Sequence, residues 1–256
     1  TTWRRAACRS ALVAAAVILL GTQPLAGAGL GSAIWPSRHS STEVRSVRCG
    51  GHDYQYVLSV PGGSRSKPAL LLLHGAGGVA RDFVDAWQPL ATSKGVVLIA
   101  PQLPRELWFE AVAPAAFRCI IADARQHAFI DPARIYLFGY SMGGYLAFDG
   151  ALLAPDAFAA VAVYGAAIAP DYESLIGGAA RRIPTAIYIG TRDQFYPLTM
   201  VRRTRDLLQA AGFTVHYVEF ANQNHAYAPV ADRLQRDAWA FLSAYRLPGD
   251  SLRRGH

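Results

Sequence analysis

The chain has 256 residues, of which 52% are hydrophobic and 17% charged; this is enough apolar material for a sizeable core and excludes an intrinsically disordered protein. Its formal net charge of +7 comes from 25 Lys and Arg against 18 Asp and Glu. The positive charges form no basic stripe with interleaved aromatic residues, so we expect no nucleic-acid partner.

Residues 1–28 have the pattern of a bacterial-type export signal. Three arginines precede an uninterrupted apolar run at 11–20, and Ala26-Gly27-Ala28 supplies a small-residue cleavage site. The run is shorter than the roughly 20 residues that a membrane-spanning helix needs. We therefore expect a cleaved signal peptide, no stable membrane span after processing, and a secreted or periplasmic protein. Retention of the segment as an N-terminal anchor is the alternative.

The three cysteines are too scattered to form a metal-binding motif, and cleavage would leave Cys49 and Cys119. In an oxidising compartment these two can form a disulfide, and two buried free thiols fit the sequence as well. The sequence leaves both alternatives open.

The predicted strands follow a flexible lead-in at 29–43 that is rich in Gly, Ser and Pro. Two β-prone runs, 44–49 and 54–60, flank a Gly-Gly turn and predict an antiparallel hairpin. Six further apolar runs are typical of strands buried on both faces; they lie at 68–73, 95–100, 134–139, 159–165, 185–190 and 213–220.

Helical spacing of apolar residues separates the later runs. The helical patterns lie at 83–91, 117–128, 142–153, 201–209 and 234–245, and Pro89 is expected to bend or restart the first of them. Alternating strands and helices predict an α/β fold, with a mostly parallel eight-stranded sheet covered by helices on both faces. We expect a single domain at 44–246 and a C-terminal tail at 247–256.

The most specific motif is Gly139-Tyr140-Ser141-Met142-Gly143-Gly144. This G-x-S-x-G pattern lies between a β-prone run and a helix-compatible segment, which is the context of a nucleophile elbow. Such a turn exposes the serine at the carboxyl end of the sheet, and its glycines let the flanking segments pass closely. The motif predicts Ser141 as a nucleophile; a serine that only caps the helix is the alternative.

A second motif, His74-Gly75-Ala76-Gly77-Gly78, follows the third predicted strand. Acyl transfer needs two backbone N–H donors aimed at the position where the oxyanion forms. We assign one donor to Met142 and the other to Ala76, with Gly75 and Gly77 as alternatives for the second. His74 is interpreted as an anchor of this loop, and an ordinary glycine-rich turn would also fit the motif.

A nucleophilic serine needs a base, and the base needs a carboxylate that orients it. His225 lies in the loop after the last predicted strand, and Asp193 directly follows the strand before it, so both belong to the carboxyl edge of the sheet. Asp171 and Asp232 are the rival carboxylates. The chain order Ser141, Asp193, His225 is one of the known orders of a Ser-His-Asp triad.

On these motifs the sequence resembles an α/β-hydrolase from the first hairpin to the final helix. It is most similar to small secreted esterases grouped with polyhydroxybutyrate depolymerases, feruloyl and acetylxylan esterases and dienelactone-hydrolase-like proteins. The resemblance implies an eight-stranded sheet, a serine nucleophile and ester hydrolysis. The sequence departs from dienelactone hydrolases proper, which use cysteine where this chain has Ser141, and we expect none of the appended modules common in the depolymerases.

We therefore predict a secreted serine hydrolase that cleaves carboxylic esters through an acyl-enzyme, without a metal or an organic cofactor. The segment at 166–183 is too short for a lid domain, which disfavours an interfacial lipase. Trp108, Phe109, Tyr140 and Phe195 are candidate substrate-binding residues, although packing over the sheet edge explains such aromatic residues equally well. The expected substrate is a small-molecule or polymer-attached ester. A serine peptidase or amidase, or a non-catalytic binding protein, is the alternative.

Overall fold

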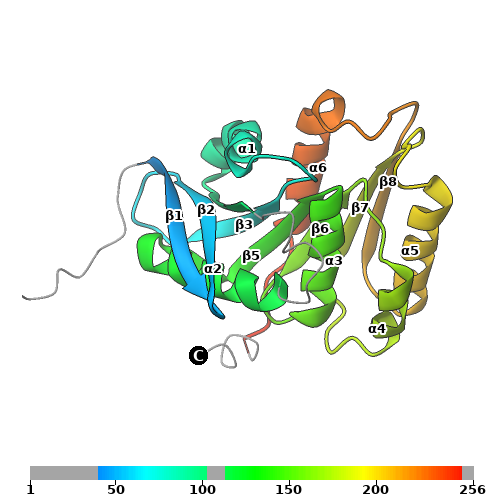
Figure 1. Cartoon of the computed structure of the whole chain (residues 1–256), viewed down its shortest axis with the longest axis horizontal. Coiled ribbons are helices and arrows are strands. Elements are labelled where there is room, and N and C mark those ends of the chain that lie inside the picture. Colours follow the sequence, from blue (N-terminus) through cyan, green and yellow to red (C-terminus); the bar gives the residue numbers. More distant parts are fainter. Residues whose placement is uncertain (1–39, 103–112, 250–256) are drawn as a thin grey trace, which may run out of the picture. The chain divides into compact units, whose positions relative to one another are not determined.

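A computed structural model describes residues 40–102 and 113–249 (Figure 1). The strands in these ranges form one sheet in the order β1-β2-β4-β3-β5-β6-β7-β8. β2 runs antiparallel to both of its neighbours, β1 and β4, and the remaining pairs are parallel. The strands are β1 Ser41–Cys49, β2 His52–Val60, β3 Lys67–Leu73, β4 Val97–Gln102, β5 Ile130–Tyr140, β6 Ala160–Tyr164, β7 Thr185–Gly190 and β8 Val215–Phe220. The predicted eight-stranded, mostly parallel α/β fold is confirmed.

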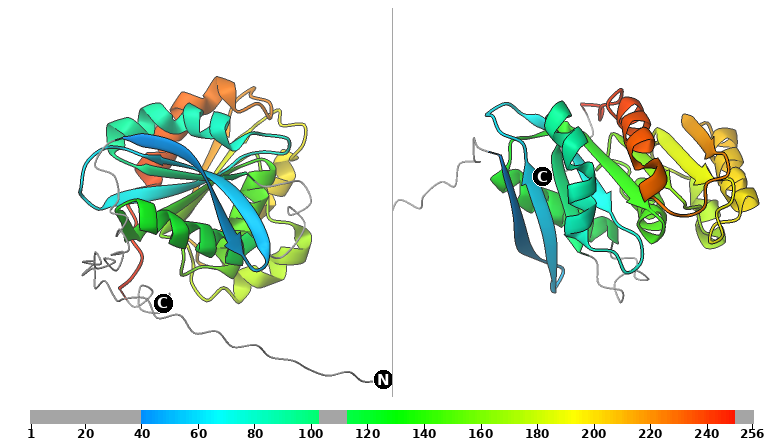
Figure 2. Two further views of the ribbon diagram at one scale, coloured as in Figure 1. Left: turned by 60° about the vertical axis from the view of Figure 1, so that its left-hand side comes forward. Right: turned by 90° about the horizontal axis from the view of Figure 1, so that it is seen from above.

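Helices cover both faces of the sheet (Figure 2). α1 (Ala80–Lys94) and α6 (Ala231–Leu242) contribute buried residues to the core on one face. The other face is covered by α2 Ala113–His127, α3 Met142–Leu153, α4 Glu173–Gly177 and α5 Leu198–Ala210. Two short 3₁₀ helices, η2 Pro170–Tyr172 and η3 Ala228–Val230, lie in loops that follow β6 and β8.

The central strand β3 explains why its sequence is an unbroken apolar run. Every residue of β3 is buried, and its side chains alternate between the two faces of the sheet. Leu70 and Leu72 belong to the core beneath α1 and α6, whereas Leu71 and Leu73 belong to the core beneath α2 and α3. The loop that follows β3 therefore starts from a strand that is fixed by packing on both sides.

Several elements differ from the sequence-based expectation. β1 begins at Ser41, so residues 41–43 of the predicted flexible lead-in are part of a strand that pairs with the end of β2. α1 continues through Pro89 without restarting, because the buried side chains of Trp87 and Leu90 hold this part of the helix on the sheet. α6 ends at Leu242, three residues before the last predicted helical position.

Cys49 and Cys119 form a disulfide with their Cα atoms 6.1 Å apart. It joins the last residue of β1 to α2 across 70 residues of sequence. A cross-link over such a loop restricts the unfolded chain and ties the edge hairpin to the rest of the fold. The structure thus selects the disulfide from the two alternatives that the sequence left open.

Several predictions lie outside the described residues. These are the signal segment at 1–28, the part of the lead-in at 29–39, the aromatic pair Trp108 and Phe109, and the part of the C-terminal tail at 250–256. Within the described ranges, no helix combines the length and apolar character that crossing a membrane would require.

Candidate active site

The side chains of Ser141, His225 and Asp193 form one hydrogen-bonded chain. His225 Nε2 lies 2.8 Å from Ser141 Oγ, and His225 Nδ1 lies 2.7 Å from Asp193 Oδ2. The three residues follow β5, β8 and β7, whose carboxyl ends share one edge of the sheet (Figure 1). The side chain of Asp193 is fully buried and that of His225 is 8% exposed, so solvent competes little for these bonds.

The rival carboxylates lie elsewhere. Asp171 belongs to the exposed part of η2, and Asp232 lies in the first turn of α6. Among the described carboxylates, Asp193 is the one that bonds the imidazole of His225.

Ser141 lies in a strained turn between β5 and α3. Its φ of 56° and ψ of −121° are uncommon for a residue with a side chain, and such strain is typical of a nucleophile elbow. The backbone N–H of Ser141 donates to Tyr164 O at 2.9 Å, which ties the turn to β6. The turn is also too tight for other residues, because a Cβ on Gly139 would lie 2.1 Å from Gly143 O.

The carboxylate of Asp193 uses both oxygens. Oδ2 faces His225, and Oδ1 accepts backbone N–H groups of Phe195 and Tyr196, each at 2.9 Å. Burial alone would raise the pKa of Asp193, but the hydrogen bonds from His225, Tyr196 and Phe195 outweigh it and hold the pKa below its ordinary value. Asp193 is therefore an ionised acceptor that fixes the proton of His225 on Nδ1.

The His225 loop is held by side chains from the neighbouring strands. Tyr140 donates its hydroxyl to His225 O at 3.2 Å, and Tyr164 donates to the carbonyls of Asn224 and Ala226. Gly165 has a φ of +61°, and a Cβ there would lie 2.9 Å from His225 Cε1. The glycine after β6 therefore makes room for the imidazole, a role that the sequence analysis did not assign.

The loop after β3 passes directly beside the nucleophile. A Cβ on Gly75 would lie 3.3 Å from Ser141 Cβ, so the two backbones are in close approach. A turn closes with Gly78 N–H donating to Gly75 O at 3.0 Å, and Gly77 takes the positive φ of +70° that the turn needs. The turn hydrogen bond does not use the N–H of Ala76, which is an exposed residue.

Aromatic rings surround the imidazole of His225. The ring of Tyr196 stacks on it at 5.9 Å between centroids, that of Tyr140 is tilted at 5.2 Å, and that of Phe195 is edge-on at 4.9 Å. Phe195 is 67% exposed, which is unusual for an apolar aromatic side chain beside a buried histidine. The substrate role predicted for Tyr140 and Phe195 stays a prediction; the hydroxyl of Tyr140 already supports the His225 loop.

Residues 55–247 match the dienelactone hydrolase family. The chain belongs to this family. One relative is NocK from Nocardia uniformis subsp. tsuyamanensis, which is provisionally named as an esterase; it is 28% identical over 144 residues, half of this chain and 42% of NocK. The dienelactone hydrolase family match thus covers far more of the chain than the match to this single relative.

Solved structures share the fold. A thermostable esterase superposes with a TM-score of 0.67 at 20% identity, over 80% of this chain and 63% of that protein. The S-formylglutathione hydrolase FrmB from Staphylococcus aureus has a TM-score of 0.66 at 15% identity, over 82% of this chain and 99% of FrmB. The expected α/β-hydrolase architecture of the dienelactone hydrolase family is thereby confirmed.

Proposed function

We propose that the protein is a secreted serine hydrolase that cleaves carboxylic esters. The observation that carries this proposal is the hydrogen-bonded chain from Ser141 through His225 to the buried carboxylate of Asp193. Membership of the dienelactone hydrolase family supports hydrolysis as the reaction class. A binding protein would not need a nucleophile, a base and an acid in this arrangement.

The mechanism follows from the positions of the protons. Nδ1 of His225 holds its proton toward Asp193, which leaves Nε2 free to accept the proton of Ser141 as Oγ attacks the ester carbonyl. The imidazolium then donates this proton to the leaving alkoxide, which releases the alcohol and leaves an acyl-enzyme. Water then attacks the acyl-enzyme while Nε2 of His225 takes its proton, and the imidazolium returns this proton to Ser141 Oγ as the bond to the acyl group breaks and the acid leaves.

The developing oxyanion would bind between two backbone donors. Met142 is the first residue of α3, so its N–H has no acceptor within the helix. The second donor is the N–H of Ala76. The turn that carries it passes beside Ser141, and the hydrogen bond that closes this turn uses the N–H of Gly78, not that of Ala76. Each such donor contributes about 3–4 kcal/mol in comparable sites.

We also propose that Phe195 contacts the alcohol side of the ester. The leaving alcohol must lie next to His225, because Nε2 protonates it. Phe195 presents an exposed ring on the same imidazole, and its backbone is fixed by Asp193. An aryl or other flat apolar alcohol would cover this ring, which makes aryl esters the preferred substrate class.

Export of the chain is part of the proposal. The disulfide between Cys49 and Cys119 supports it, because disulfides persist mainly in oxidising compartments. The sequence pattern at 1–28 supports the same location.

The test is hydrolysis of phenyl acetate and methyl acetate, which form the same acetyl-enzyme. We expect phenyl acetate to be hydrolysed with the higher kcat/KM. Phe195→Ala should lower kcat/KM for phenyl acetate about 5- to 30-fold, because about 1–2 kcal/mol of apolar contact is lost, and should change kcat/KM for methyl acetate less than about 2-fold. Leu153→Ala is the control, since Leu153 is also an exposed apolar residue but ends α3 far from Ser141. Equal losses on both esters would remove Phe195 from the alcohol site, and no hydrolysis of either would contradict the esterase proposal.

A further inference from the structure

The side chain of Gln102, the last residue of β4, connects several parts of the loop that follows β3. Its Oε1 accepts the backbone N–H of Ala80 at 2.8 Å, and its Nε2 donates to Gly78 O at 3.2 Å. Nε2 also lies 3.4 Å from His74 Nε2. One amide thus contacts the start, the turn and the end of the segment that carries Ala76.

The hydrogen bonds around His74 are consistent with a single protonation state. His74 Nδ1 lies 2.8 Å from Gly75 O, and a carbonyl only accepts, so Nδ1 carries the proton. Nε2 is then the acceptor for the amide of Gln102. His74 is 4% exposed, and burial lowers its pKa, which agrees with a neutral imidazole.

Gln102 also caps the first turn of α1. Val79, the residue before the helix, makes no side-chain cap, and the first helical N–H, that of Ala80, is bonded by Gln102 instead. The segment from His74 to Ala80 is therefore anchored at its first residue, at its turn and at its last residue by one side chain of the neighbouring strand.

We propose that Gln102 is a positioning residue for the oxyanion-binding loop. It holds the turn from Gly75 to Gly78 against the nucleophile, so that the N–H of Ala76 keeps the distance and direction that the oxyanion requires. This inference rests on the proposed esterase function. Because Gly75 and Ser141 are in close approach, even a small shift of the turn would move the donor away from the reacting oxygen.

The proposal explains why this residue is a glutamine. The position needs one acceptor, for Ala80 N–H, and one group that donates to both Gly78 O and His74 Nε2. An ionised glutamate has acceptors alone: it would face the carbonyl of Gly78 without a donor and would favour a charged His74. A protonated glutamic acid regains one donor.

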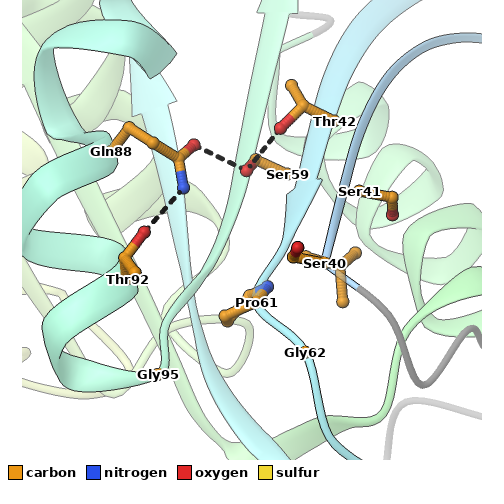
Figure 3. A pocket seen from close by; sticks show the side chains of 10 residues that line it. Ser40, Ser41, Thr42, Ser59, Pro61, Gly62, Gln88, Thr92 and Gly95 are labelled. Carbon is orange, nitrogen blue, oxygen red and sulfur yellow. Dashed lines mark hydrogen bonds between the residues drawn. The ribbon is translucent and has the colours of Figure 1, made fainter.

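Gln88 provides a matched control. It lies on α1, and its side chain also bridges two hydroxyl groups: Ser59 Oγ donates to Oε1 at 2.7 Å, and Nε2 donates to Thr92 Oγ1 at 3.1 Å (Figure 3). These residues line a cavity of about 410 Å³ at the opposite edge of the sheet from the triad. Removing Gln88 therefore removes a bridging amide without touching the loop of Ala76.

The experiment compares Gln102→Leu with Gln88→Leu, using kcat and KM for phenyl acetate together with the thermal midpoint. We expect Gln102→Leu to lower kcat about 10- to 100-fold while KM stays within about 2-fold, because the oxyanion donor acts in the transition state. Gln88→Leu should lower the thermal midpoint by a comparable amount and leave kcat within about 2-fold. In Gln102→Glu, the ratio of activity to wild type should rise as the pH falls and the carboxyl regains its proton.

A kcat for Gln102→Leu within 2-fold of wild type would overturn the inference. So would a loss of kcat in Gln88→Leu equal to that in Gln102→Leu. If Gln102→Leu does not fold, the pH-dependent ratio of Gln102→Glu decides, and a ratio that is flat with pH would count against the role. In both cases an active wild type leaves the esterase proposal standing. A wild type that hydrolyses no ester overturns the proposed function and this inference with it.

Discussion

Replacing Ser141 with alanine should lower kcat for phenyl acetate by about 10⁴-fold or more, because the triad acts as a unit and loses its nucleophile. The remaining hydrolysis would come from the oxyanion donors and from substrate binding. The substitution keeps a Cβ at the strained φ of 56°, so the turn meets no new backbone cost. Initial rates at saturating ester, with circular dichroism to compare the fold, measure the effect.

Ser174→Ala is the matched control for this variant. Ser174 is an exposed serine in α4, and its loss should leave kcat unchanged within error. Ester hydrolysis that survives in Ser141→Ala at more than a hundredth of the wild-type rate would mean that another residue is the nucleophile.

The second large effect concerns stability and comes from Asp149 on α3. Asp149 is buried, with 8% of its surface exposed. None of the described residues donates a hydrogen bond to its carboxylate or forms an ion pair with it. Burial therefore raises the pKa of Asp149 to about 7. The neighbouring Tyr145, one turn earlier on α3, has a pKa raised to about 12 by burial and by Asp149, so it stays neutral in this range.

The sign of the pH effect follows from linkage. Below about pH 4 the carboxyl is protonated in the folded and the unfolded chain, and the folded state bears no penalty. Between about pH 4 and pH 7 the unfolded chain releases the proton while the folded protein keeps it, so the free energy of unfolding falls as the pH rises. Above pH 7 the carboxyl is ionised in both states, and the free energy of unfolding has fallen by its full amount, about 2–4 kcal/mol.

Asp149→Asn should therefore stabilise the protein at pH 8 by about 2–4 kcal/mol and have little effect near pH 4. Urea unfolding of both proteins at the two pH values measures the difference. Asp171→Asn, at an exposed carboxylate, is the control and should change stability by less than about 0.5 kcal/mol at either pH. A stability difference that is the same at pH 4 and pH 8 would contradict the raised pKa of Asp149.

The parts of the fold that could be predicted are those with a dense local signal. β3 could be predicted because it is buried on both faces. The elbow around Ser141 could be predicted because its G-x-S-x-G pattern is local and Gly139 packs against Gly143, four residues later. The order of strands then brings Asp193 and His225 to the same edge as Ser141, since parallel strands end together. Local pattern and topology were together sufficient to nominate the three residues.

The parts that could not be predicted depend on contacts between distant segments. Whether Cys49 pairs with Cys119 depends on how α2 docks on the edge hairpin, which no local pattern reports. Gln102 binds a loop more than 20 residues earlier in the chain. The sequence shows it as no more than a polar residue at the carboxyl end of a buried strand. Gly165 is likewise visible in the sequence as a glycine directly after a buried strand, β6, without an indication that His225 packs against it.

Covalent labelling by a fluorophosphonate, which reacts with a serine activated by a histidine base, tests most directly whether Ser141 is the nucleophile. We expect one adduct per chain, located by peptide mass spectrometry on Ser141, with loss of ester hydrolysis in step with labelling and no adduct in Ser141→Ala. An unlabelled protein, or an adduct on another residue that accompanies the loss of activity, would contradict Ser141 as the nucleophile.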